Sequence, residues 1–364
     1  MALRGRALAI VAVLAAVPLS GCLDILSAGS DGYGETWPLE MVQAQALHDR
    51  DLTGAGVTVA IIDTGIDLSH PEFDGVPVRW ADLVGGQKSA YDDNGHGTHV
   101  AGIIAAQGRW STMFSGFRLK GVAPEVSLIV IKAIDHSGEG DESRVAQGIQ
   151  TAVSNGADII VLSLGGQTRA IFGTNTESKV REAIQQGVYV IAAAGNTKDG
   201  ETDCTVNSPA SVEGVIAVGA VDRDGRIGAF SCRGTGKEGA GTALPGLPSP
   251  VRSSVDPHKK PEVVAPGVQV LSTWSRDKGS EYALADGTSQ AAPMVAGVLA
   301  LVLQAKPHLS RDGNQGESTV VAVKSKLMST AAKIGPLAGK GPTAHDERYG
   351  YGLVQGEALL LALG

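Results

Sequence analysis

The sequence predicts an α/β protein with a three-layer fold, in which a mostly parallel sheet is buried between helices on both faces. Short runs rich in valine and isoleucine alternate with segments of helical periodicity along most of the chain. Aromatic residues make up only 4% of the chain whereas glycines number 49, so aliphatic side chains and close backbone contacts must fill the interior. Strands that are apolar on both faces are typical of a parallel sheet covered by helices.

Five apolar segments are predicted as strands of this sheet. They are residues 57–63, 126–134, 157–164, 187–195 and 214–221. The expected helices are residues 142–154, 176–186, 289–306 and 317–332. Reactive groups in such a sheet gather at the carboxyl ends of the strands, so candidate site residues are sought there.

A single domain is expected for a chain of 364 residues, with residues 37–364 as the folded unit. The segment 233–258 is rich in Gly, Pro and Ser and is predicted to be a surface loop inserted in that domain. The formal charge of -8 is modest and no long run of lysine or arginine occurs, so no nucleic-acid partner is expected. We expect a monomer.

The amino terminus has the layout of an export signal. Residues 1–21 begin with two arginines and continue through an apolar stretch of about 13 residues, too short to span a bilayer. The stretch ends in LSGC, which resembles the lipobox of bacterial-type lipoproteins and implies that Cys22 is lipidated and anchors the protein to the cell membrane. Residues 22–36 would then form a flexible tether. The alternative is an ordinary signal peptide with an incidental cysteine, and in either case an extracytoplasmic location is predicted.

The remaining cysteines are Cys204 and Cys232. An even pair in an oxidising compartment favours a disulfide. Two free buried thiols are the alternative, because spacing alone does not fix the geometry.

Asp63 and His96 are two candidate reactive residues. Asp63 ends the first predicted strand, although an aspartate there can also be a simple turn former. His96 lies between two glycines where a turn enters a helix. His99 is three residues further on and lacks the H-E-x-x-H spacing of a zinc site, so it is expected to be a buried structural histidine. His96 is the better candidate for a general base.

Ser289 stands at the start of a predicted helix, just after Gly287. The free amides and the positive dipole end of that helix favour an anion beside the hydroxyl, although a serine there can also be a simple helix cap. A hydroxyl becomes a good nucleophile only when a base takes its proton, and the base needs a carboxylate to hold its tautomer. Asp63, His96 and Ser289 meet these needs. Asn196 follows another strand and is predicted to donate to an oxyanion, unless it is only a turn residue.

Three segments resemble, in family order, the catalytic signatures of the subtilisin-like serine proteases, the subtilase family: VAIIDTGID, GHGTHVAGI and GTSQAAPMVAG. The segments GVAP, VLSLGG, AAAGN, KPEVVAPG and YGYGLV also match family blocks, so the similarity extends from residue 37 to the end. The resemblance implies a serine endopeptidase that acts on polypeptides through an acyl-enzyme. In it Asp63 would orient the base, His96 would be general base and acid, Ser289 the nucleophile and Asn196 the oxyanion donor.

The resemblance also places an extended substrate between two backbone segments, which would pair with it as added strands. Their residues are Gly138, Glu139, Gly140, Ser163, Leu164 and Gly165. Glu139, Asp141 and Glu142 put three acids beside the first segment. They predict a preference for basic residues on the amino side of the cleaved bond, or they are only a solvated loop.

The resemblance implies no cofactor for catalysis and leaves a structural calcium ion open. Glu72 matches a family position that is often a calcium ligand, but the segment before GVAP does not resemble the usual calcium loop, so no metal ligands are predicted. The alternative function is that of a catalytically silent, peptide-binding lipoprotein. An esterase on an α/β-hydrolase frame is disfavoured because its G-x-S-x-G elbow does not occur.

Overall fold

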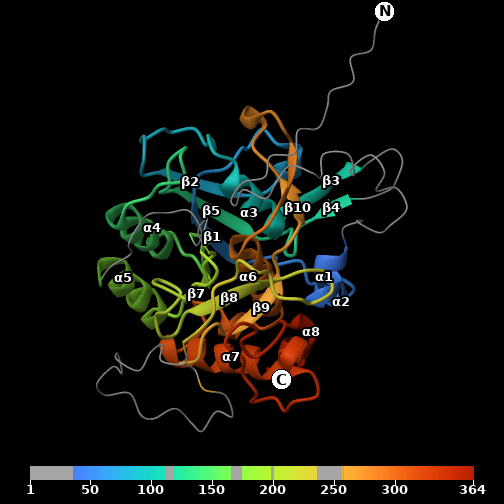
Figure 1. Ribbon diagram of the computed structural model, residues 1–364. Helices are drawn as coiled ribbons and strands as arrows, with labels where there is room; N and C mark the ends of the chain where they lie inside the picture. Colours follow the sequence, from blue (N-terminus) through green and yellow to red (C-terminus); the bar gives the residue numbers. More distant parts are fainter. Residues whose placement is uncertain (1–35, 112–117, 165–173, 198–200, 236–255, 257) are drawn as a thin grey trace, which may run out of the picture.

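The computed structural model describes residues 36–111, 118–164, 174–197, 201–235, 256 and 258–364. At its centre is a seven-stranded sheet in the order β2-β5-β1-β6-β7-β8-β9, and every neighbouring pair in it is parallel (Figure 1). The predicted α/β fold with a mostly parallel sheet is therefore confirmed. The predicted signal peptide, Cys22, Gly165 and most of the predicted loop 233–258 lie outside the described residues.

The strands of the central sheet are short and are separated along the chain by helices. They are β1 (Thr58–Asp63), β2 (Val78–Asp82), β5 (Ser127–Lys132), β6 (Ile159–Leu162), β7 (Tyr189–Ala193), β8 (Ile216–Val221) and β9 (Val263–Pro266). Two antiparallel pairs lie outside this sheet. They are β3 (Gln107–Ser111) with β4 (Arg118–Lys120), and β10 (Val270–Thr273) with β11 (Tyr282–Ala285).

Helices pack on the central sheet, chiefly as two pairs. The helices are α1 (Trp37–Met41), α2 (Ala44–His48), α3 (His96–Ala105), α4 (Glu142–Ser154), α5 (Thr174–Gln185), α6 (Thr288–Ala305), α7 (Glu317–Thr330) and α8 (Gly356–Ala362). The pair α3 and α6 pack on each other and on the sheet, and so do α4 and α5. Figure 1 shows α6 running through the middle of the molecule.

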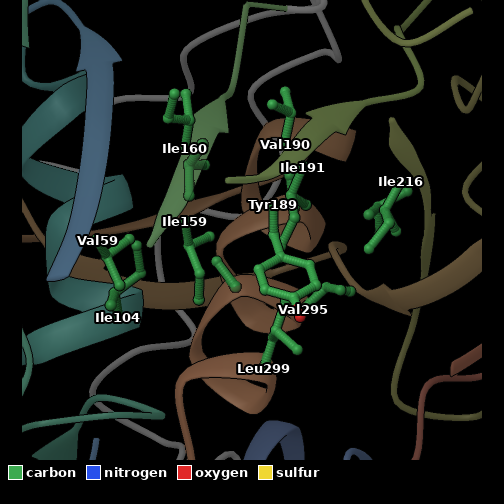
Figure 2. Packing of buried hydrophobic residues seen from close by; sticks show 14 of the residues in the cluster. Val59, Ile104, Ile159, Ile160, Tyr189, Val190, Ile191, Ile216, Val295 and Leu299 are labelled. Carbon is green, nitrogen blue, oxygen red and sulfur yellow. The ribbon is translucent and has the colours of Figure 1, made fainter. Parts of the chain in front are cut away.

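Every residue of β6, β7 and β8 is buried, although successive side chains point to opposite faces. Both faces of the sheet are therefore covered. Figure 2 shows this core, where aliphatic side chains of the strands meet Val295 and Leu299 of α6. Of the described helices, only α6 is long and apolar enough to cross a membrane, but 89% of it is buried inside the protein, which makes it a core helix.

The five predicted strands correspond to β1, β5, β6, β7 and β8, and the four predicted helices to α4, α5, α6 and α7, each within two residues at either end. The sequence pattern missed β2 because it is a partly exposed edge strand with polar residues, VRWAD. It also missed β9 and the β10–β11 pair. These strands have four residues each, too few for a clear periodicity.

The strand order reverses at β1, which has β5 on one side and β6 on the other. At such a switch point the loops beyond the carboxyl ends diverge and leave a crevice for a ligand. Asp63 is the last residue of β1, and Ser163 follows directly on β6. Ile61 pairs with Val161, so the same register carried forward by two residues puts Ser163 level with Asp63.

Candidate active site

Asp63 and His96 form a close pair at the switch point. The distance from His96 Nδ1 to Asp63 Oδ1 is 2.7 Å, and the same oxygen accepts the backbone N–H of Thr64 at 2.7 Å. The Asp63 side chain is 1% exposed whereas that of His96 is 13% exposed. The carboxylate thus holds one ring nitrogen of the imidazole, and the other is left available for proton transfer.

A close backbone contact places the histidine. Helix α3 begins at His96, and the next residue, Gly97, lies against the end of β1. A Cβ on Gly97 would stand 2.2 Å from the carbonyl oxygen of Gly65, so no other residue fits there without displacing the backbone. Gly97 is therefore the residue that lets α3 begin close against the backbone that follows β1.

The electrostatic surroundings make His96 more basic than usual. Burial lowers its pKa, but the charge of Asp63, the hydrogen bond to Asp63 and the charge of Asp92 together raise it above the ordinary value of 6.5. His99 differs, because burial and then the charge of His96 lower its pKa to about 3. His99 is fully buried and contacts the carbonyl oxygen of Ala283 at 3.1 Å through Nε2, as expected of a neutral structural histidine.

Ser289 lies in the first turn of α6 and is 4% exposed. Its hydroxyl donates to the carbonyl oxygen of Ser163 at 3.0 Å, while the Ser163 hydroxyl donates to the carbonyl oxygen of Ser289 at 3.0 Å. These reciprocal bonds join the start of α6 to the end of β6, one strand away from Asp63. The contacts of the Ser289 hydroxyl among the described residues are with Ser163 and do not include a hydrogen bond to His96.

Asn196 is oriented by the start of the same helix. Its Oδ1 accepts both the backbone N–H and the hydroxyl of Thr288, each at 3.0 Å. Because a backbone N–H can only donate, these bonds identify the oxygen of the carboxamide and turn Nδ2 the other way. A Cβ on Gly287 would lie 3.4 Å from Asn196 Nδ2, so the amide donor faces the residue that precedes Thr288 and Ser289.

The sequence prediction missed a layer of buried polar residues behind the Asp63–His96 pair. Thr64, Asp92 and Lys132 are each at most 2% exposed. Lys132 Nζ donates to the carbonyl oxygen of Thr64 at 2.6 Å and to Asp93 Oδ1 at 2.7 Å. The signal that could have indicated this layer is the pair of consecutive aspartates just before the His96 turn.

The first predicted substrate segment forms a tight turn. Ile134 and Gly140 are bridged in antiparallel fashion, and Asp135 N–H donates to the carbonyl oxygen of Glu139 at 2.9 Å. The backbone N–H of Glu139 is also used inside the turn, by Asp135 Oδ1 at 3.0 Å. The bond from Asp135 to Glu139 makes Ile134 and Gly140 a non-hydrogen-bonded pair, so the backbone N–H and carbonyl of Gly140 point away from Ile134. Both backbone groups of Glu139, a predicted substrate contact, are therefore hydrogen-bonded within the turn. Its side chain is exposed.

The three acids beside this segment do not act alike. Asp141 caps α4 through Arg144 N–H at 2.8 Å and pairs with the Arg144 side chain at 2.5 Å. Glu142 Oε1 accepts the backbone N–H groups of Asn175 and Thr176 at 2.8 and 3.2 Å. Two of the three carboxylates therefore bind groups of the local structure, although Asp141 is exposed as well, and Glu139 is an exposed acid whose carboxylate is not used in this way.

Cys204 and Cys232 are joined by a disulfide. The bond lies beside the candidate oxyanion donor: Cys232 N–H donates to the carbonyl oxygen of Gly195 at 3.0 Å, and a Cβ on Gly195 would be 3.0 Å from Cys232 Sγ. The crosslink therefore supports the backbone from which Asn196 projects.

Glu72 does not have the surroundings of a calcium ligand. It is fully buried, and Oε2 accepts the backbone N–H of Arg109 at 3.0 Å. Tyr282 also hydrogen-bonds to it, and burial followed by the charge of Glu72 raises the pKa of that tyrosine. These partners are donors, whereas a hard cation needs several oxygen ligands. Among the described residues no group of three or more His, Cys, Asp or Glu side chains could hold a metal ion.

The comparisons with known proteins agree with the fold. The sequence profile of the subtilase family matches residues 54–352. The chain belongs to the subtilase family of peptidases, and it is a subtilisin-like serine endopeptidase.

Individual relatives match over most of their length. M-protease of Shouchella clausii is 37% identical over 323 residues, which cover 88% of this chain and 69% of that protein. Subtilisin Savinase of Lederbergia lenta is 36% identical over 323 residues, covering 88% of this chain and 97% of the relative. Subtilisin E of Bacillus subtilis is 35% identical over 330 residues, covering 90% of this chain and 72% of the relative.

Proposed function

We propose that this endopeptidase hydrolyses peptide bonds of extracytoplasmic proteins through an acyl-enzyme, with Asp63, His96 and Ser289 as its catalytic triad. The observation that carries the proposal is the 2.7 Å contact between His96 Nδ1 and Asp63 Oδ1 at the switch point of the sheet. Support comes from Ser289, which is joined to the neighbouring strand end through Ser163.

The proposed chemistry begins with proton transfer. His96 takes the proton of the Ser289 hydroxyl as Ser289 Oγ attacks the carbonyl carbon of the substrate, and Asp63 stabilises the imidazolium that forms. The amide of Asn196 donates to the oxyanion, a contribution typically worth about 10² to 10³ in kcat for one donor. The imidazolium then protonates the leaving amine, and water enters by the reverse sequence to release the acid product.

Ser289→Ala is the direct test of this mechanism. The variant should lose several orders of magnitude in kcat on a chromogenic peptide amide, and a fluorophosphonate probe should label the native protein at Ser289 but not the variant. Ser318→Ala is the matched control, because Ser318 is an exposed serine on α7. A probe adduct at another residue, or an active Ser289→Ala variant, would contradict the proposal.

We further propose that Glu139 favours basic residues on the amino side of the cleaved bond. Its carboxylate is exposed in the turn before α4, while Asp141 and Glu142 are used locally. Native enzyme should cleave a lysine peptide faster than the matched glutamate peptide, and Glu139→Gln should reduce that preference about 2- to 5-fold, the size of one exposed ion pair. Asp312→Asn, at an exposed site after α6, is the control. Equal cleavage of the two peptides by the native enzyme would remove the idea.

The N-terminal segment is proposed to place the enzyme outside the cytoplasm on a lipid anchor at Cys22. Its sequence pattern is the support, since these residues lie outside the described part of the chain. Cys22→Ala should move the protein from the membrane fraction to the soluble extracytoplasmic fraction. A variant that stays firmly membrane-bound would exclude lipidation of Cys22 as the anchor.

A further inference from the structure

We propose that Asp92 is a positioning residue that fixes His96 relative to Asp63 through a shared hydrogen-bond network. The inference rests on the catalytic roles proposed above for these two residues. Asp92 is 1% exposed and lies in the loop before α3, and both of its carboxylate oxygens are used by the protein.

The first part of the network holds the backbone on both sides of His96. Asp92 Oδ1 accepts the N–H groups of Asn94 and Gly95 at 3.1 and 2.8 Å, in the turn that precedes the histidine. Asp92 Oδ2 accepts the N–H and the hydroxyl of Thr98 at 2.9 and 2.6 Å, in the first turn of α3. Because one rigid carboxylate makes all four bonds, the turn before α3 and the first turn of α3 keep a constant relative position.

The second part joins this turn to Asp63 through Thr64. The Thr64 hydroxyl donates to Asp92 Oδ1 at 2.9 Å and accepts the N–H of Gly97 at 2.8 Å. The N–H of Thr64 donates to Asp63 Oδ1, the oxygen that contacts His96. Thr64 therefore links the residue after His96, the carboxylate of Asp92 and the carboxylate that orients the imidazole.

Asp92 also supplies a second buried negative charge near His96, and this charge contributes to the raised pKa of the histidine. Lys132 is the buried cation beside this layer, and its ammonium is paired with Asp93 at 2.7 Å. His99 on the next turn of α3 is neutral because its pKa is lowered to about 3.

One more charged residue lies by this end of α3: the backbone N–H of Asp67 donates to the Thr98 hydroxyl at 3.0 Å, and the Asp67 carboxylate accepts the N–H groups of Ser69 and Arg276, both at 2.9 Å. Helix α6 and strand β10 contain no charged residue. Glu72 and Lys120 lie by the far end of α3, where Glu72 accepts the N–H of Arg109 and Gly121 N–H bonds to Ala106. Removing the Asp92 charge should therefore shift the titration of His96 to lower pH, whereas breaking the network without a charge change should not.

Asp92→Asn tests the charge and the network together. We expect a folded protein whose kcat falls about 10- to 100-fold, the usual cost of slightly misplaced catalytic groups, with KM nearly unchanged. The acid limb of its kcat/KM profile should move to lower pH. Thr64→Val should lower kcat without moving that limb, and Thr64→Ser, which keeps the hydroxyl, should recover most of the loss.

Asp158→Asn is the matched control for losing a buried carboxylate. Asp158 accepts the N–H groups of Thr58 and Arg311 at 2.9 and 3.1 Å, at the opposite end of the sheet. Its replacement should change stability but neither kcat nor the pH profile. An equal loss of kcat in Asp158→Asn would show that Asp92 acts only through general stability, and would overturn the proposal.

The outcomes separate this inference from the proposed mechanism. If Ser289→Ala is inactive but Asp92→Asn and Thr64→Val keep native kcat, the positioning role is wrong and the triad stands. If Ser289→Ala keeps its activity, the mechanism fails and the inference with it. Should Asp92→Asn not fold, the Thr64→Val and Thr64→Ser pair decides, since a native kcat in Thr64→Val overturns the network.

Discussion

The two ends of the central sheet both bury charged side chains but use them differently. At the amino end of β8 and β9, Glu262 is fully buried with its carboxylate 2.8 Å from Lys260 Nζ and 2.6 Å from Lys324 Nζ, and both lysines are 1% exposed. At the carboxyl end, the buried Asp63 faces an imidazole that keeps 13% of its side chain exposed. The first cluster is closed to solvent and the second is open on one side.

In the proposed mechanism, this difference separates charges that serve the fold from charges that serve chemistry. The contacts of Glu262 with Lys260 and Lys324 hold α7 to the start of β9, so this cluster serves the fold. An imidazole changes its charge near neutral pH, so its partner carboxylate controls a proton that can move. Substitutions at the two ends should therefore change different quantities, kcat at one end and stability at the other.

The largest effect is expected at the open end. Asp63→Asn keeps the shape of the side chain but removes the charge that stabilises the imidazolium, so kcat should fall by about 10⁴ while the protein stays folded. Peptide hydrolysis and circular dichroism on the same samples measure both. A kcat within tenfold of the native value would show that the open end does not differ from the closed end.

The closed end should respond in stability instead. Glu262→Ala leaves two buried ammonium groups without their shared carboxylate, and it should lower the free energy of unfolding by about 3 to 5 kcal/mol. The kcat of the protein that remains folded should be unchanged. Urea denaturation gives the first quantity, with Glu182→Gln as control because Glu182 is exposed and makes only local surface contacts with Lys179 and Ser178 on its own helix. A native-like urea midpoint would mean that the cluster contributes nothing to the fold.

The carboxyl end is expected to depend on its disulfide for stability, since it lacks a closed ionic cluster of this kind among the described residues. Cys204 and Cys232 are 28 residues apart, so the paired Cys→Ser variant should lose about 3 to 4 kcal/mol through the freer unfolded chain. Reductant should lower the urea midpoint of the native protein but not that of the variant. If reductant has no effect on either, the crosslink does not stabilise this end.

The pH dependence should appear only at the open end. The general base must be neutral, and the pKa of His96 is raised, so the acid limb of kcat/KM should lie above pH 6.5. The stability that His96 gains from its carboxylates has the opposite dependence. It is fully present below pH 6.5 and is lost as pH rises through the folded-state pKa. Kinetic and denaturation profiles measured in the same buffers should show activity rising with pH while this contribution to stability falls. An acid limb below pH 6.5 would contradict the prediction.

The smallest effect is expected from metal removal. The carboxylate of Glu72 is satisfied by protein donors, as at the closed end, so a chelator should leave the thermal midpoint within about 2 °C of its original value, a shift on the order of 1 kcal/mol for a domain of this size. A clear fall that added calcium reverses would show that a metal site supports the fold.

Much of the fold and of the candidate site could be predicted from the sequence pattern. Strands such as β7 and β8 are buried on both faces, so their composition alone marks them. The edge strand β2 and the four-residue β9 have no such mark, because pairing rather than composition makes them strands. The motifs around Asp63, His96 and Ser289 identified the candidates by resemblance. The consecutive aspartates before His96 were a local sign of Asp92, whereas nothing in the local pattern revealed Thr64.

By itself, the sequence determined the α/β class, five strands of the sheet and the three motifs that mark the family. These features depend on residues that are neighbours along the chain, so a linear pattern records them. Only the tertiary structure decided that the backbone groups of Glu139 are hydrogen-bonded within a turn and that Glu72 accepts from protein donors. It also decided that Asp92 links the segments that contain Asp63 and His96. Each of these depends on distances between residues far apart in sequence, which are set when the strands pair and the helices pack.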